Sequence, residues 1–131
     1  MCGHPARAGV DVTIAAVGGE RTVRSARQVN VVADALAEEL DYSAFDAVIL
    51  PGGIPGVHNL QASETVKNAC TRMAADGKIV AAICAAPTVL AAFGLLKGKR
   101  ATVYPGMDEA LTAAGAEYTG LPLSVDGNII T

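Results

Sequence analysis

The sequence contains no tryptophan and few other aromatic residues, and several further features are missing. Acidic residues outnumber lysine and arginine, the net charge is −3, and no basic patch occurs, so nucleic acid is not an expected partner. The chain shows no internal repeat and no long polar or low-complexity run, which argues against repeat architectures and disorder. The GxGxxG pattern of dinucleotide-binding folds is also absent.

Cysteine is scarce as well. Cys2, Cys70 and Cys84 show no CxxC spacing, so neither a disulfide framework nor a zinc site is expected, and no metal is assigned. The N-terminal segment MCGHPARAG lacks the apolar core of a signal peptide, which makes the cytoplasm the expected location.

One apolar run, residues 79–96, comes close to the length of a membrane span. Pro87 and Gly94 interrupt it, lysines flank it, and a span needs about 20 predominantly apolar residues. We therefore expect no contact with a membrane.

The 131 residues suffice for a single domain over residues 1–131 with one core. Strand-like and helix-like segments alternate along the chain. The expected strands lie within residues 9–19, at Val23, at 29–32, in 46–50, in 78–84, in 101–104 and in three short C-terminal segments, the last two joined by a turn at Asp126-Gly127. The expected helices are 63–76, one beginning at Pro87, and 107–114.

Two of these strands, DAVIL and KIVAAIC, are apolar along their whole length. Such strands are typical of parallel sheets that are buried on both faces. The pattern predicts an α/β fold with a mainly parallel sheet between layers of helices. In these sheets, functional residues gather at the carboxyl ends of the strands, here residues 51–53 and 84–86.

Cys84 follows the second apolar strand directly and precedes the helix that begins at Pro87. A nucleophile at the apex of a strand-to-helix turn is the nucleophile-elbow arrangement, which needs small neighbours such as Ala85 and Ala86. The helix's positive end favours the thiolate. A buried, inert cysteine is the alternative, and the helical spacing of Cys70 indicates that role for Cys70.

The segments VILPGGIPGVHNL, KIVAAICAAPTVLA and ATVYPG, in this order, resemble the ThiJ/PfpI family, whose fold is also that of class I glutamine amidotransferases. RAGVDVTIAAVGG and DGNIIT extend the resemblance over nearly the whole chain. It implies a flavodoxin-like three-layer sandwich. Measured against the family, the chain would lack the first strand and the last helix, so we expect a partial domain.

The resemblance also implies roles for individual residues. Cys84 matches the nucleophilic, oxidation-sensitive cysteine of the family. Gly53 and Ala85 match the two backbone donors to the substrate oxyanion, with Gly52 beside them. Tyr104 matches a position where some members carry a histidine that assists proton transfer.

Arg27 matches an arginine near the pocket and the dimer contact of the family, although an ordinary solvated charge explains it equally well. The glutamate that hydrogen-bonds the cysteine in the family has no counterpart in this sequence. A homodimer is expected for the full-length form.

Three functions remain open. The resemblance implies a cofactor-independent deglycase or glyoxalase III-like enzyme that acts on aldehydes such as methylglyoxal or on glycated protein, with weak activity in a truncated form. A stress protein without turnover, which senses oxidation through Cys84 and acts as a chaperone, is the second. A cysteine peptidase or amidotransferase-like hydrolase is the third, although Ala85 stands where such enzymes place a histidine.

Overall fold

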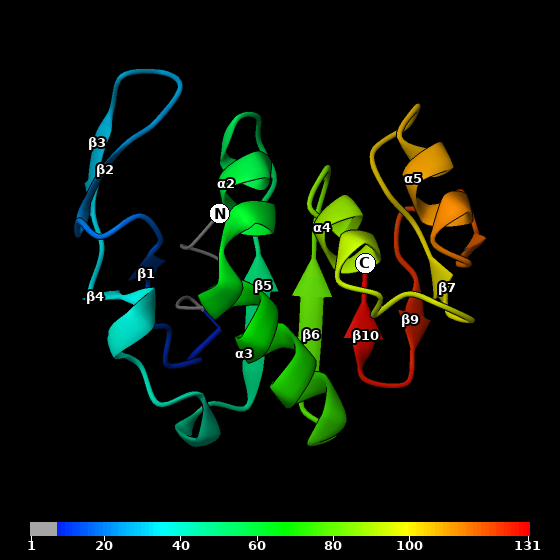
Figure 1. Ribbon diagram of the computed structural model, residues 1–131, viewed down its shortest axis with the longest axis horizontal. Coiled ribbons are helices and arrows are strands. Elements are labelled where there is room, and N and C mark those ends of the chain that lie inside the picture. Colours follow the sequence, from blue (N-terminus) through cyan, green and yellow to red (C-terminus); the bar gives the residue numbers. More distant parts are fainter. Residues whose placement is uncertain (1–7) are drawn as a thin grey trace. The chain divides into compact units, whose positions relative to one another are not determined.

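The computed structural model describes residues 8–131 (Figure 1). The chain divides into two compact units, Met1–Leu40 and Asp41–Thr131. Cys2 lies outside the described residues. The second unit holds most of the regular structure and both described cysteines.

The first unit contains short strands and one turn of 3-10 helix, η1 (Ala37–Glu39). Strand β1 (Ala15–Ala16) pairs in parallel with β4 (Ala35–Leu36), and β2 (Thr22–Arg24) pairs antiparallel with β3 (Asn30–Val32). The hairpin confirms the two strands predicted there. The strand predicted within residues 9–19 is shortened to two residues, because its partner β4 offers only two residues to pair with.

The second unit is built on a four-stranded sheet in the order β5-β6-β10-β9. Strands β5 (Ala47–Leu50), β6 (Ile79–Ala82) and β10 (Ile129–Ile130) are parallel, and β9 (Val125–Asp126) is antiparallel to β10 across the predicted turn. A separate parallel pair joins β7 (Arg100–Ala101) to β8 (Glu117–Tyr118). The predicted α/β class with a mainly parallel sheet is therefore confirmed.

Four helices accompany this sheet, together with the 3-10 turn η2 (Tyr42–Ala44). They are α2 (Gly56–Ala62), α3 (Glu64–Ala75), α4 (Pro87–Ala92) and α5 (Asp108–Ala113). Ser63 begins α3 as predicted, since its hydroxyl oxygen accepts a hydrogen bond from the Val66 amide at 3.3 Å. Within the described residues, no helix has both the length and the apolar character needed to cross a membrane.

The helices cover one face of strands β5 and β6. Helices α3 and α4 pack over this face, which carries the buried side chains of Leu50, Val80 and Ala82. The alternate side chains point the other way, and Ile49 and Ile79 are 56% and 43% exposed. We expected both faces of these strands to be buried. For the described residues this prediction is wrong, because the helices pack on only one face of β5 and β6.

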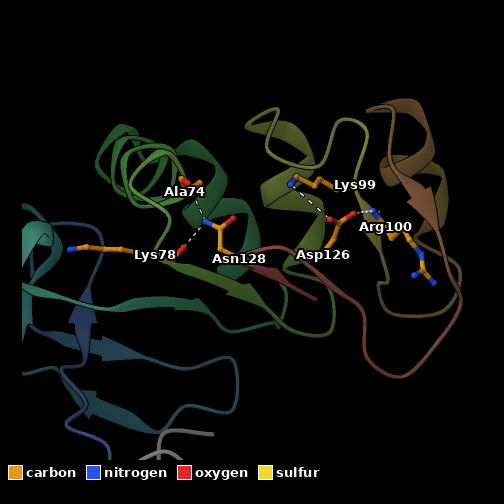
Figure 2. Close-up of polar contacts among 6 residues, drawn as sticks. All are labelled: Ala74, Lys78, Lys99, Arg100, Asp126 and Asn128. Atoms are coloured by element: carbon orange, nitrogen blue, oxygen red, sulfur yellow. Dashed lines mark hydrogen bonds and ion pairs between the residues drawn. The ribbon is translucent and has the colours of Figure 1, made fainter.

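The β9–β10 turn is fastened to the beginning of β6 by Asn128, as Figure 2 shows. The side-chain amide nitrogen of Asn128 donates to the carbonyl oxygens of Ala74, at 3.1 Å, and Lys78, at 2.7 Å. On the far side of the turn, Asp126 accepts a hydrogen bond from the Arg100 amide at 2.8 Å. These bonds fix how the C-terminal hairpin meets α3 and β7.

Candidate active site

The two strand ends that the sequence singles out lie side by side. Leu50 and Ala82 are register partners at the ends of β5 and β6, and the pairing continues with a 3.2 Å hydrogen bond from the Ile83 amide to the Leu50 carbonyl. The segment after β5 therefore runs next to the turn that carries Cys84. The carboxyl edge of a parallel sheet is where such folds place their ligands.

Cys84 occupies the apex of a tight turn between β6 and α4. Its φ of +62° is in the left-handed region, which costs a residue with a β-carbon about 1–2 kcal/mol. The turn is held by its own carbonyls: that of Ile83 accepts from the Ala86 amide at 3.0 Å, and that of Cys84 from the Tyr104 amide at 2.8 Å. The result is an exposed thiol on a firmly held backbone.

Gly52 packs directly against this turn. A β-carbon at Gly52 would lie 2.7 Å from the β-carbon of Cys84 and 3.3 Å from the amide nitrogen of Ala85. Gly53 follows with a φ of +100°, and its carbonyl accepts a bond from Val57 in the first turn of α2. The structure thus brings Gly52, Gly53 and Ala85 together beside the thiol.

The amide groups of Gly53 and Ala85 are available at this point. Among residues 8–131, neither amide donates a hydrogen bond within the protein. Ala85 itself is buried, and its carbonyl is engaged by Thr88, whose hydroxyl donates to it at 2.7 Å. Two unpaired N–H donors next to a nucleophile have the composition of an oxyanion hole.

A cleft of about 380 Å³ is lined in part by Cys84. Tyr104 and Pro105 line it, as do Tyr118 and Leu121 from β8 and the loop after it. The sequence singled out Tyr104 but not the residues of this loop. The signal available for them was their position at the carboxyl end of a further strand.

Arg27 belongs to the first unit, where it is exposed on the β2–β3 turn and its amide donates to the Ser25 hydroxyl at 3.3 Å. Its predicted role at the pocket remains a prediction.

Cys70 differs from Cys84 in its exposure to solvent. It lies on α3 with no exposed surface, which confirms the predicted core position. Burial raises the pKa of the Cys70 thiol to about 11, because the charged thiolate is disfavoured away from water. Cys84 is therefore the accessible thiol of the two that the structure describes.

Comparison with known proteins agrees with the fold. The model of the DJ-1/PfpI family matches residues 4–131. The crystal structure of Drosophila melanogaster DJ-1beta superposes with a TM-score of 0.88 at 37% identity, covering 95% of this chain and 67% of that one. These findings define an α/β protein of the flavodoxin-like type with a cysteine at a strand-to-helix turn.

The chain belongs to the DJ-1/PfpI family. Protein DJ-1 homolog A of Arabidopsis thaliana is 39% identical over 126 residues, which are 95% of this chain and 32% of that protein. A Pyrococcus abyssi protein named as a deglycase is 36% identical over 103 residues, 79% of this chain and 60% of the relative. The chain thus spans about a third of the Arabidopsis relative and two thirds of the Drosophila one.

Proposed function

We propose that the protein is a cysteine-dependent enzyme of the deglycase or glyoxalase type, acting on reactive aldehydes such as methylglyoxal and on their protein adducts. One observation carries the proposal: an exposed cysteine at a φ of +62° stands beside two unpaired backbone amides. Membership in a family with members named as deglycases supports this reaction class.

The first step is addition of the Cys84 thiolate to the aldehyde carbon of methylglyoxal. A carbon–sulfur bond forms, and the carbonyl electron pair moves onto the oxygen. The amides of Gly53 and Ala85 donate to that oxygen as its charge develops. The product is a hemithioacetal held on the turn.

The second step moves the C1 proton of the hemithioacetal to C2. The former aldehyde carbon is oxidised and the ketone carbon is reduced, so no outside electron acceptor is needed. The resulting lactyl thioester is hydrolysed by water, which releases lactate and regenerates the Cys84 thiol. In this proposal Tyr104, which lines the cleft, donates a hydrogen bond or shapes the pocket.

The test is lactate formation from methylglyoxal by the purified protein. We expect Cys84→Ala to reduce the rate to that of the uncatalysed solution, whereas Cys70→Ala, which alters a buried thiol, retains activity below its unfolding temperature. The proposal fails if Cys84→Ala turns over methylglyoxal as fast as the parent protein.

A second candidate function is redox sensing, with or without a chaperone role. It is favoured by the contrast between an exposed Cys84 and a buried Cys70, since oxidation follows thiolate character and exposure. Mass spectrometry after mild peroxide treatment tests it. Selective oxidation of Cys84 in a protein without aldehyde turnover would favour this function over the first.

Assembly and location complete the proposal. We propose that the protein is a cytoplasmic homodimer, with Arg27 near the pocket and the dimer contact. Sedimentation of the parent protein and of Arg27→Ala tests this assignment. A monomeric parent protein contradicts the dimer. An Arg27→Ala variant whose dimer affinity and turnover are unaltered contradicts the role of Arg27.

A further inference from the structure

The cleft beside Cys84 is formed by the carboxyl ends of several strands. Cys84 comes from the turn after β6, and Pro87 is the first residue of α4. Tyr104 comes from the segment after β7, Tyr118 and Leu121 from β8 and its loop, and Thr131 from the segment after β10. Cys84 therefore lines a cleft whose walls come from separate parts of the second unit.

The walls of this cleft are mostly apolar. Two tyrosine rings, three prolines and three aliphatic side chains contribute to them, together with Thr102 and Thr131, and no lining side chain among residues 8–131 is charged. The ring of Tyr118 is held close to the backbone at Gly120, where a β-carbon would lie 3.7 Å from the ring. The Thr131 hydroxyl oxygen already accepts a hydrogen bond from the Thr102 amide at 2.9 Å.

We propose that this cleft is a subsite for an uncharged aromatic group on the aldehyde that Cys84 attacks. The protein would then prefer an aryl oxoaldehyde, with phenylglyoxal as the probe, over methylglyoxal. This inference rests on the proposed function, because it assumes that Cys84 adds to the aldehyde. The hydrolysed product of phenylglyoxal is mandelate, formed by the same proton shift and addition of water.

The size and chemistry of the cleft support a ring in preference to a methyl group. Its volume of about 380 Å³ lies within the range of small-molecule sites, roughly 300–1,000 Å³. A methyl group leaves most of that space to water, whereas a phenyl ring contacts the tyrosines and Leu121. Because a single methylene in an apolar pocket changes kcat/KM by about 10–200-fold, we expect kcat/KM for phenylglyoxal to be at least about tenfold higher.

Two exposed leucines in the same loop provide a matched pair of variants. Leu121 lines the cleft and is 51% exposed, whereas Leu123 is 60% exposed and does not line it. We expect Leu121→Asp to lower the ratio of kcat/KM for phenylglyoxal to that for methylglyoxal by about tenfold. Leu123→Asp should leave the ratio unchanged. Equal ratios in the parent and both variants would overturn the subsite.

A binding measurement separates the subsite from the reaction. Acetophenone carries the ring without an aldehyde, so it should protect Cys84 from iodoacetamide at a concentration about tenfold lower than acetone does. Leu121→Asp should remove that difference. Equal protection by the two ketones overturns the inference, whereas selective protection without lactate or mandelate formation refutes the proposed function and leaves the ring-binding subsite standing.

Discussion

Gly52 and Cys84 approach each other so closely that a β-carbon on the glycine would lie 2.7 Å from the β-carbon of the cysteine. The same atom would lie 3.0 Å from the carbonyl oxygen of Ile83. Both neighbours belong to a backbone that is hydrogen-bonded in place, so neither can move aside easily. Glycine is therefore required at position 52, because a larger residue would collide with the turn that carries Cys84. The absence of a side chain at Gly52 allows the two strand ends to lie this close together.

Gly52→Ala is expected to displace the turn that carries Cys84. Overpacking against fixed backbone costs about 1–3 kcal/mol, so we expect the free energy of unfolding to fall by that amount and aldehyde turnover to fall with it. Gly56→Ala is the control, because a β-carbon there meets nothing within 4 Å. Urea denaturation and steady-state kinetics provide the measurements, and equal effects of the two substitutions would contradict the packing argument.

The left-handed backbone at Cys84 predicts an inversion of the usual preference for alanine over glycine. Cys84→Gly removes the β-carbon that makes this φ costly, and Cys84→Ala retains it. We expect Cys84→Gly to be more stable than Cys84→Ala by about 1 kcal/mol in urea denaturation. Ala82→Gly, at a buried site without positive φ, should instead be destabilising, and a less stable Cys84→Gly would refute the argument.

Stability should fall as the pH rises from about 9 to about 11, in part because of Cys70. Burial raises the pKa of the Cys70 thiol from 9.0 to about 11. In this window the unfolded chain has lost the thiol proton and the folded protein still binds it, so each further pH unit favours unfolding by up to about 1.4 kcal/mol. Below about pH 9 both states keep the proton and the effect vanishes. The stability of Cys70→Ala should decline less steeply with pH than that of the parent protein, as measured by urea midpoints across this window. Parallel declines in the parent protein and in Cys70→Ala would contradict the assignment.

Asn128 should contribute substantially to stability through its side-chain amide. Asn128→Ala leaves the carbonyls of Ala74 and Lys78 without this donor, which we expect to cost about 1–3 kcal/mol. Asn128→Asp should cost more at neutral pH, because a carboxylate would face two carbonyl oxygens, and it should recover on acidification as the carboxylate is protonated. Asn68→Ala, at an exposed position on α3, is the control in thermal denaturation. A stability of Asn128→Asp equal to that of the parent would show that the two bonds contribute little.

The strand, turn and helix around Cys84 could be predicted because local signals agree there. An apolar run, small residues and a proline at the first helical position all indicate a strand, a turn and a helix over residues 79–92, and the structure confirms this order. The cap at Ser63 and the turn at Asp126-Gly127 are local in the same sense. The helix α2 was not predicted, because neither a capping residue nor an apolar periodicity indicates this short helix in the sequence.

The features that the sequence did not reveal depend on contacts between distant segments. An apolar strand such as β5 reads as buried on both faces, yet the exposure of Ile49 depends on where the described helices pack. The space required at Gly52 arises only once two strands are in register. Likewise, Asn128 reads as a turn residue until the structure places Ala74 and Lys78 beside it.

The φ of +62° at Cys84 also limits how this position can change over evolutionary time. Valine, isoleucine and threonine are poorly tolerated in such a conformation, whereas glycine, asparagine and aspartate adopt it more readily. Lineages that abandon the thiol should therefore drift toward those three residues. A survey of related sequences that lack the cysteine would then distinguish loss of the chemistry from loss of the fold. Branched side chains at this position are expected only where the fold of the turn is lost.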